Sequence, residues 1–282
     1  MSLVDIKKVA VCGFGLIGGS ITLDLQKGSK LPLTVAYDKS KILMALKKDK
    51  RFKVTIEADL KKAIHGSDIV ILAATHSGNE KLLMQLTKMK NLTDCLIIDT
   101  GAVKSSIVKL SHQLKLSEGT QFLASHPMSG KEKKGFENSE AAIFQGYTWF
   151  VDDEVKLTEN NKKRFDWLIN KTKSLPVYIS SSLHDQLVSE ISHLPQLIST
   201  ILGAQINSDM ISLAGPGLKS MLRLAGSPYT VWEEIIDQNR DEVLKSLNLY
   251  IDNLNSIVNK IKKKESLSDV FKAAARSYKC LS

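Results

Sequence analysis

Three glycines near the amino terminus have a spacing that lets backbone N–H groups hold a phosphate. Gly13-Phe14-Gly15-Leu16-Ile17-Gly18 fits the pattern G-x-G-x-x-G and lies between a strand-like run and a helix-periodic segment. The glycines would allow a tight turn, a close backbone approach to a pyrophosphate and close packing of helix on strand. A helix start there adds unpaired N–H groups for the phosphates. A glycine-rich turn without a ligand is the alternative interpretation.

An acidic residue, Asp38, ends the next strand-like run, where a carboxylate can accept hydrogen bonds from ribose hydroxyls. The same charge repels a 2′-phosphate and so favours NAD over NADP, although Lys39 and Lys41 stand nearby and weaken that preference. We therefore predict NAD as the cofactor. The predicted contacts are Gly13, Gly15, Leu16, Ile17, Gly18, Asp38, Thr75 and Thr100.

A histidine, His126, lies in Ser125-His126-Pro127-Met128-Ser129-Gly130, at the end of another strand-like run. The carboxyl ends of strands in an open α/β sheet face the ligand crevice. A neutral imidazole at that place can take a hydroxyl proton while a hydride leaves the same carbon. We predict His126 as the catalytic base, with a buried structural histidine as the alternative.

The later part of the chain adds a histidine pair and an arginine. His184-Asp185 and Ser192-His193-Leu194-Pro195-Gln196 fall in one helical pattern, and the proline predicts a kink where a ligand can enter. Arg223 is one of five arginines and stands in an apolar run, so it needs an anion. A substrate carboxylate and an internal salt bridge to a glutamate would both satisfy that need.

Strand-like runs and helical segments alternate over the first part of the chain, which favours a doubly wound, mostly parallel sheet of the Rossmann type. Several runs are continuously apolar, as in strands buried on both faces. The predicted strands are 8–13, 33–38, 68–75, 95–101, 122–128, 147–153 and 176–180. The predicted helices between them are 16–27, 40–48, 79–89, 103–115 and 158–173.

Helical patterns alone follow the short polar stretch Ser180-Ser181-Ser182. They cover 182–208, 217–225, 228–263 and 266–279. The predicted fold class is α/β, with an NAD-binding domain over 1–180 and an all-helical substrate and dimerisation domain over 181–282. A small helical domain cannot easily cover all its apolar faces alone, which favours a homodimer.

Length and composition limit the class of protein. The 282 residues suit about two domains, and 43% hydrophobic with 24% charged residues excludes a disordered or fibrous chain. The net charge of +9 comes mainly from scattered lysines without interleaved aromatics, which argues against nucleic acid. No apolar run is long enough to span a membrane, no secretory signal is visible, and the three cysteines indicate neither disulfides nor a metal site. These features predict a cytoplasmic protein that binds no membrane.

Together the motifs resemble the prephenate/arogenate dehydrogenase family of tyrosine biosynthesis, over nearly the whole chain. The matching motifs are Gly15-Leu16-Ile17-Gly18-Gly19-Ser20, Asp99-Thr100-Gly101-Ala102-Val103-Lys104, Ser125 to Gly130, His184-Asp185 with Ser192 to Pro195, and Arg223 with Trp232. The resemblance implies NAD-dependent oxidative decarboxylation of prephenate to 4-hydroxyphenylpyruvate. NAD would take the hydride from C4 of the ring, and the C1 carboxylate would leave as carbon dioxide. Arogenate, giving tyrosine directly, is the alternative substrate.

The resemblance also implies roles for particular side chains. His126 would draw the proton from the C4 hydroxyl, and Arg223 would hold a substrate carboxylate. Glu132 matches an acid that helps to gate the site in relatives, and Trp232 would reach the pocket of a partner subunit. The predicted substrate-binding set is Arg223, Gln196, His193, Ser192, Trp232 and Glu132.

Two positions depart from the family pattern. Many relatives carry serine where Ala102 stands, and its hydroxyl helps to orient the catalytic histidine; here Thr100, Ser125 or a water would take its place. Relatives that use prephenate often have histidine at the position of Gln196, near the pyruvyl or alanyl tail of the substrate. A neutral glutamine accepts as well as donates hydrogen bonds, so it could tolerate the ammonium of arogenate.

Two other classes of protein compete with this interpretation. A β-hydroxyacid dehydrogenase or a pyrroline-carboxylate reductase has the same layout, but with a catalytic lysine or another substrate loop. A cofactor-binding sensor without catalysis would explain Ala102 and Gln196 as signs of lost activity. Because the chain ends at Ser282, soon after the last helical pattern, we expect any feedback by tyrosine to act at the active site rather than at an ACT-type module.

Overall fold

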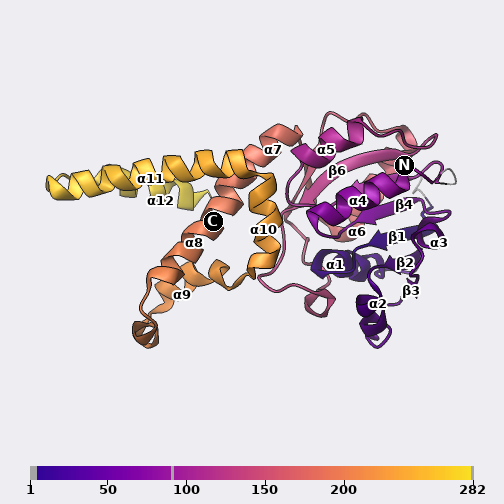
Figure 1. The fold of residues 1–282 in the computed structure, drawn as a ribbon, viewed down its shortest axis with the longest axis horizontal. Helices are drawn as coiled ribbons and strands as arrows, with labels where there is room; N and C mark the ends of the chain where they lie inside the picture. Colours follow the sequence, from indigo (N-terminus) through magenta and orange to yellow (C-terminus); the bar gives the residue numbers. More distant parts are fainter. Residues whose placement is uncertain (1–4, 90–91, 281–282) are drawn as a thin grey trace.

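The computed structural model describes residues 5–89 and 92–280 and places their strands in one sheet (Figure 1). The strand order is β3-β2-β1-β4-β5-β6-β7-β8. The strands are β1 (Lys8–Cys12), β2 (Leu33–Tyr37), β3 (Thr55–Ile56), β4 (Ile69–Leu72), β5 (Leu96–Asp99), β6 (Gln121–Pro127), β7 (Thr148–Asp152) and β8 (Leu175–Ile179). Strands β1 to β6 are parallel, β7 is antiparallel to β6, and β8 is parallel to β7.

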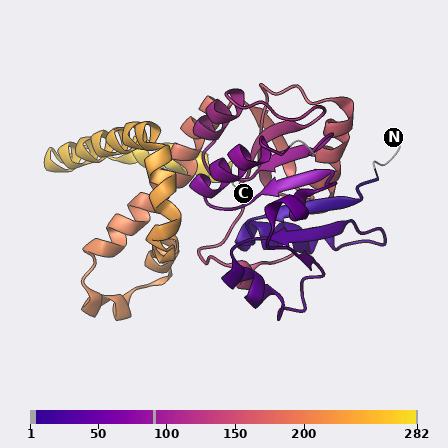
Figure 2. The same ribbon diagram turned by 45° about the vertical axis from the view of Figure 1, so that its right-hand side comes forward.

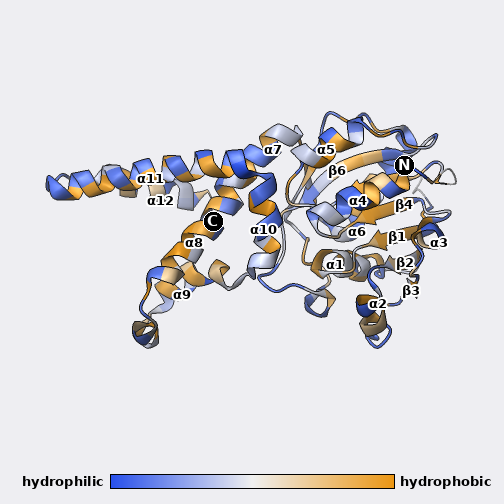
Figure 3. Ribbon diagram, in the orientation of Figure 1, coloured by the Kyte–Doolittle hydropathy of each residue, from blue (hydrophilic) through white to orange (hydrophobic). Residues whose placement is uncertain are grey.

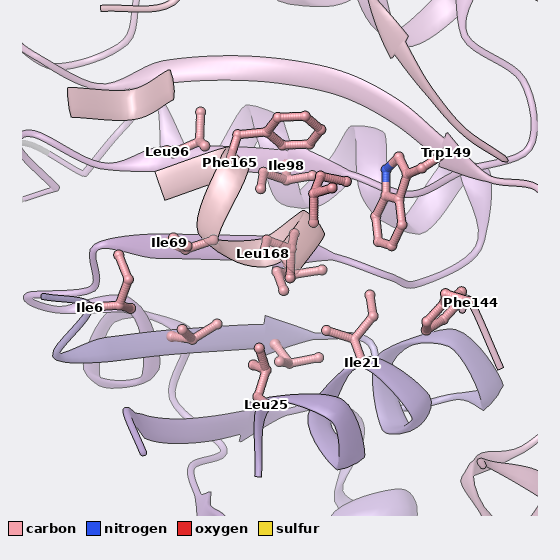
Figure 4. Packing of buried hydrophobic residues seen from close by; sticks show 14 of the residues in the cluster. Ile6, Ile21, Leu25, Ile69, Leu96, Ile98, Phe144, Trp149, Phe165 and Leu168 are labelled. Carbon is pink, nitrogen blue, oxygen red and sulfur yellow. The ribbon is translucent and has the colours of Figure 1, made fainter. Parts of the chain in front are cut away.

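Helices cover both faces of this sheet. They are α1 (Leu16–Leu25), α2 (Ser40–Leu46), α3 (Leu60–Ile64), α4 (His76–Leu86), α5 (Ser105–His112) and α6 (Glu159–Thr172). Ile69 of β4 and Ile98 of β5 pack in one layer with Ile21 of α1 and Phe165 of α6 (Figure 4). The next residue of β4, Val70, points to the opposite layer, which α3, α4 and α5 cover. The continuous apolar runs are therefore buried on both faces, as predicted.

The predicted α/β class, a doubly wound and mostly parallel sheet followed by helices, is confirmed. The sequence patterns did not indicate β3 and α3, because an element of two residues and one of five are too short to show a period. The predicted boundary between 1–180 and 181–282 stays a prediction. It falls at Ser180, whose Oγ accepts the N–H of Leu183 as the N-cap of α7 (Ser181–Val188). Residues 1–4 and 281–282 of the predicted domains lie outside the described residues.

The second part of the chain is helical. After α7 it contains a π-helical turn η2 (Ser189–His193), α8 (Leu194–Gln205), η3 (Ser208–Leu213), α9 (Pro216–Leu222), η4 (Leu224–Gly226), α10 (Tyr229–Gln238), α11 (Arg240–Lys262) and α12 (Ser268–Lys279). The predicted kink at Pro195 takes the form of η2, because proline lacks the N–H that would continue the regular ladder.

The prediction of one helix over 228–263 is wrong. The chain breaks between α10 and α11 at Asn239, where φ is −109° and ψ is 27°. The Asn239 Nδ2 group is buried and donates to the carbonyl O of Asp185 at 2.8 Å. This contact holds Asn239 out of the helical conformation and fixes the corner between the two helices.

Helix α11 extends away from the sheet, with α12 beside it (Figures 1 and 2). Only Val243 and Ser246 of α11 are buried, and α12 has no buried residue. Figure 3 shows hydrophobic residues recurring along α11 between hydrophilic ones. The exposed apolar side chains of the two helices are Leu244, Leu249, Ile251, Leu254, Val258, Ile261, Val270, Phe271 and Tyr278. Within the described ranges no helix is long and apolar enough to cross a lipid bilayer. The cytoplasmic location stays a prediction.

Candidate active site

The glycine loop after β1 has the geometry that its spacing predicts. Gly13 has φ +97°, in the left-handed region, and a Cβ there would lie 2.3 Å from the backbone N of Ala74. A Cβ on Gly18 would lie 2.2 Å from the carbonyl O of Gly13. Apart from its chain neighbours, no described atom lies within 4 Å of a Cβ built on Gly15. The loop is therefore closed where it meets the sheet and open at Gly15.

Backbone N–H groups are available at the start of α1. The first bond of the helix runs from the Gly19 N–H to the Gly15 carbonyl O at 2.9 Å. The N–H groups of Leu16, Ile17 and Gly18 consequently have no partner inside the helix. Three such groups at the positive end of a helix dipole can donate hydrogen bonds to an anion such as a pyrophosphate.

Asp38, directly after β2, lies beside the glycine loop. Its Oδ2 accepts the N–H of Phe14 at 2.5 Å and its Oδ1 accepts the N–H of Lys39 at 2.6 Å. Phe14 itself is buried against Phe52 and Phe136, which anchors the loop. The carboxylate is thus fixed at the carboxyl edge of the sheet, where a ribose would lie.

The two predicted threonines lie at the same edge of the sheet but have local partners. Thr75 is the N-cap of α4, and its Oγ1 accepts the N–H of Gly78 at 3.3 Å. Thr100 follows β5, and its hydroxyl donates to the carbonyl O of Leu72 at 3.0 Å. The Thr100 hydroxyl therefore holds β5 to β4.

His126 lies near the carboxyl end of β6 and is half-buried. Its Nδ1 lies 3.1 Å from Nε2 of His184 in α7, and Nδ1 of His184 lies 2.8 Å from Oδ1 of Asp185. Asp185 also accepts the backbone N–H groups of Lys104 and Ser105, both at 2.8 Å, at the start of α5. A row of three side chains, of which His184 and Asp185 are buried, thus leads from the sheet into the helical domain.

The expectation that Thr100 or Ser125 would orient His126 is wrong. Side chains alternate along a strand, so Ser125 points to the face opposite His126. Its hydroxyl donates to the Asp99 carbonyl O at 2.7 Å and accepts the Trp149 indole N–H at 2.9 Å. The partner of His126 is His184.

A buried ion pair lies beneath the histidines. The Lys104 ammonium pairs with the Asp99 carboxylate and donates to the carbonyl O of Ser125 at 2.8 Å. The Asn79 amide donates to Asp99 Oδ1 at 2.7 Å, so the carboxylate is bonded from two sides. This network joins the ends of β5 and β6 to α4 and fixes the backbone that carries His126.

Three histidines of the site, His126, His184 and His193, have a lowered pKa, which favours the neutral imidazole at pH 7. Burial, followed by the repulsion that a protonated His126 would meet from His184 and from the Lys104 ammonium, holds the pKa of His126 well below its ordinary value of 6.5. Burial also lowers the pKa of His184, although Asp185 opposes that shift. Burial lowers the pKa of His193 to about 4. The Asp185 carboxyl has its pKa lowered by the N–H donors around it, against the effect of burial.

These shifts predict a loss of stability in mild acid. Below pH 6.5 the unfolded chain protonates these three histidines while the folded chain keeps them neutral, so the unfolded state binds more protons and the free energy of unfolding falls. His193 alone contributes about 1.4 kcal/mol per pH unit between 6.5 and about 4. The free energy of unfolding can be measured with urea at several pH values across that window. Its slope against pH should be steeper for the wild type than for His193→Gln. Equal slopes would contradict the neutral state of His193, and the exposed-site variant His112→Gln serves as the control.

The π-helical turn carries two of the predicted substrate residues. His193 is buried, with its Nδ1 3.2 Å from Asn239 Nδ2 and its ring 5.8 Å from the Trp232 ring in an edge-to-face contact. Ser192 beside it is half-buried. Trp232 therefore packs on a histidine of its own chain, and its reach into the pocket of a partner subunit stays a prediction.

Gln196 is buried one turn further along. Its Nε2 donates to the carbonyl O of Leu224 at 2.9 Å and to the hydroxyl of Thr200 at 3.2 Å. Its Oε1 is buried without a hydrogen-bond partner among the described residues. Because a carbonyl only accepts, the contact with Leu224 fixes which end of the amide is left unsatisfied.

Arg223 forms an internal salt bridge to a glutamate, which was one of the two interpretations of this residue. Its guanidinium pairs with the carboxylate of Glu132, on the segment after β6, and its side chain is 66% exposed. Two further contacts join the domains nearby. Lys134 Nζ donates to Thr230 Oγ1 at 2.9 Å, and the Glu234 carboxylate accepts the backbone N–H of Ser77. Arg223 and Glu132, both predicted substrate residues, thus pair with each other.

Several residues of this site were not predicted from the sequence. Glu234 of α10 accepts the N–H and the hydroxyl of Ser77 at 2.9 and 2.8 Å, at the start of α4. His76 next to it is buried, with its Nε2 2.6 Å from the Ser106 hydroxyl. No local sequence pattern predicts such contacts between distant residues. A histidine followed by an aspartate inside a helix, as in His184-Asp185, is a signal that could indicate a site residue. No group of side chains in the described part of the chain has the arrangement of a metal site.

Two family models match the chain. One, described as "Prephenate dehydrogenase, nucleotide-binding domain", matches residues 21–176, which is more than half of the sequence. The chain belongs to the prephenate dehydrogenase family. A second model, "Prephenate dehydrogenase, dimerization domain", matches residues 180–273. The glycine loop lies before the first matched range, so its assignment rests on its own geometry.

Related proteins agree with this family. A prephenate dehydrogenase of Lactococcus lactis is 26% identical over 266 residues, which are 92% of this chain and 73% of that protein. A crystal structure of prephenate dehydrogenase from A. aeolicus with hydroxyphenyl propionate and NAD+ superimposes with a TM-score of 0.84 at 21% identity, covering 99% of both chains. An arogenate dehydrogenase from Synechocystis gives 0.71 at 20% identity, over 96% of this chain and 97% of that one. The predictions of family, oxidoreductase class and nucleotide-binding domain are confirmed, and membership excludes the two other dehydrogenase and reductase families.

Proposed function

We propose that the protein is an NAD-dependent prephenate dehydrogenase, converting prephenate to 4-hydroxyphenylpyruvate, carbon dioxide and NADH. The observation that carries the proposal is the place of His126: a neutral histidine at the carboxyl end of β6, on the same edge of the parallel sheet as the glycine loop that follows β1. A base is needed there if a hydroxyl proton leaves as the C4 hydride is transferred.

The residues around the glycine loop fit NAD. Gly15 leaves space where a pyrophosphate would approach, and the N–H groups of Leu16, Ile17 and Gly18, which have no partner inside the helix, would donate hydrogen bonds to it. The carboxylate of Asp38 would accept the ribose hydroxyls and oppose a 2′-phosphate. NAD+ in the A. aeolicus complex supports the same cofactor. When bound, NAD would supply the hydride acceptor.

His126 would act on the C4 hydroxyl of the ring. Its Nε2 has no hydrogen-bond partner among the described residues, so this nitrogen is available to the substrate. The neutral imidazole accepts the hydroxyl proton as the C4–H bond breaks, and the C1 carboxylate leaves as carbon dioxide while the ring becomes aromatic. Aromatisation supplies driving force, so the side chains chiefly position the ring and polarise the hydroxyl.

Arg223 would hold a carboxylate of the substrate by exchanging partners. An exposed ion pair contributes at most about 1 kcal/mol, so Glu132 can be displaced by a substrate anion. Glu132 lies on the segment after β6 and Arg223 at the end of α9, so the exchange would also loosen one contact between the domains. The other proposed substrate residues, Ser192, His193 and Trp232, surround the π-helical turn and its aromatic contact.

Arogenate is the second candidate substrate, and Gln196 favours it. The buried Oε1 of this residue lacks a donor, and an ammonium on the substrate tail would supply one. The keto group of prephenate would not, because it also only accepts.

The deciding experiment follows absorbance of NADH with purified protein, NAD, and either prephenate or arogenate, and repeats both with NADP. Reduction of NAD with prephenate is the expected result. Reduction of NAD with arogenate alone would show that the protein is an arogenate dehydrogenase. Gln196→His would then be the first variant to test. If no substrate is turned over while NAD still binds, the protein is a cofactor-binding sensor.

We also propose a homodimer formed through the helical domain over 181–282, with the NAD-binding domain over 1–180. Support comes from the matched dimerization model and from the apolar side chains that α11 and α12 leave exposed. Sedimentation of the purified protein would test it, with a monomer at micromolar concentration as the contradicting result.

A further inference from the structure

We propose that Asp185, acting through His184, fixes the tautomer of His126 so that its Nε2 always carries the lone pair. The inference deepens the proposed function and rests on it for its effect on turnover. It assigns His184 and Asp185 as positioning residues. Neither is among the residues that the sequence predicts to contact substrate or cofactor.

The backbone at the start of α5 fixes how Asp185 forms its hydrogen bonds. Asp185 Oδ1 accepts the Lys104 N–H and Oδ2 accepts the Ser105 N–H, both at 2.8 Å. A backbone N–H can only donate, so both carboxylate oxygens act as acceptors. The start of α5 adds the positive end of a helix dipole, which favours the ionised carboxylate.

The contact between Asp185 and His184 fixes which nitrogen of His184 carries the proton. Oδ1 of Asp185 lies 2.8 Å from His184 Nδ1, and an oxygen that accepts requires a nitrogen that donates. His184 therefore carries its proton on Nδ1, and its Nε2 is left as an acceptor. The His184 side chain is only 1% exposed, so water does not compete for these contacts.

The same step repeats at His126. His184 Nε2 lies 3.1 Å from His126 Nδ1, so His126 donates from Nδ1 and its own lone pair stands on Nε2. That nitrogen is the one without a partner in the described structure. The opposite tautomer would set two lone pairs against each other at His184 and leave no base facing the substrate.

The packing of His184 restricts the ring to this orientation. Its ring lies edge-to-face on His126 at 5.3 Å and on Phe150 of β7 at 5.2 Å. The Asp185 carbonyl O accepts the Asn239 amide at 2.8 Å, which anchors α7 to the corner between α10 and α11. The row is therefore held from both domains.

The test uses NMR on the full chain labelled with ¹⁵N-histidine, together with turnover. The sequence has six histidines, and the spectrum of His126→Asn identifies the signals of His126. In the wild type we expect a proton on Nδ1 and a bare Nε2 at His126. In Asp185→Asn the new amide can donate to His184 Nδ1, which reverses both tautomers and should lower kcat by about 100-fold or more with little change in KM.

Two further variants make the result specific. Asp185→Glu keeps a carboxylate and should recover part of the lost kcat and the original tautomer. His184→Phe keeps the ring on Phe150 but removes both nitrogens, so His126 should show a mixture of tautomers even if Asp185→Asn does not fold. Asp94→Asn removes a carboxylate paired with Arg164 before β5, at the opposite edge of the sheet, and should change nothing at His126.

The proposal is wrong if wild-type His126 carries its proton on Nε2, or if its tautomer is unchanged in both Asp185→Asn and His184→Phe. These spectra need no turnover. If the wild type oxidises neither substrate, the proposed function fails while the spectra still decide the role of Asp185.

Discussion

Replacing His126 by asparagine should lower kcat by about 100-fold or more while NAD binding stays at the wild-type level. Asparagine removes the lone pair that accepts the hydroxyl proton but retains a polar side chain at the end of β6. The glycine loop and Asp38 lie on other strands, so the cofactor should still bind. Stopped-flow or steady-state formation of NADH measures the first quantity, and titration of protein fluorescence with NAD measures the second.

The matched control for this variant is His112→Asn, which changes an exposed histidine at the end of α5. It should have wild-type kcat. A His126→Asn enzyme of unchanged rate would remove His126 from the chemistry. Loss of NAD binding together with rate would instead point to a structural role for this side chain.

Replacing Arg223 by alanine should raise KM for the substrate by about 10- to 100-fold, with a smaller change in kcat. A charge-assisted hydrogen bond contributes about 1.5–3 kcal/mol, and each 1.4 kcal/mol corresponds to a factor of ten. The ion pair with Glu132 is exposed, so its loss should cost little stability. Initial rates over a range of substrate concentrations give both constants.

Arg240→Ala is the control, because Arg240 is also 66% exposed and also pairs with an aspartate, Asp237. This variant should leave KM unchanged. Glu132→Gln separates the two partners of Arg223: if Glu132 competes with the substrate, KM should stay the same or fall. An unchanged KM in Arg223→Ala would show that the substrate carboxylate binds elsewhere.

Much of the first domain could be predicted because its determinants are local. Buried parallel strands require continuous apolar runs, and the turn at Gly13 requires a glycine for its positive φ. The position of His126 follows from the direction of β6. These features need only a few neighbouring residues, so the sequence carries them in readable form.

The contacts that organise the site could not be predicted in the same way. His126 and His184 are 58 residues apart and meet only because β7 and β8 bring α7 back to the end of β6. The corner at Asn239 depends on a carbonyl 54 residues earlier in the chain. The local helical periodicity does not reveal that contact, so the sequence predicts one helix through the corner. Glu132 and Arg223 likewise pair across two domains.

Helices α11 and α12 have a thermodynamic consequence of their own. They bury only two residues between them, Val243 and Ser246, so packing within the chain contributes little to their stability. Their free energy of unfolding must come largely from whatever covers the exposed apolar side chains, and it therefore depends on the concentration of that partner. We call α11 and α12 together the helical arm. If the partner is a second copy of the chain, folding of this arm and association of the two copies become one equilibrium. Dilution alone would then melt the arm while the sheet that carries His126 stays intact.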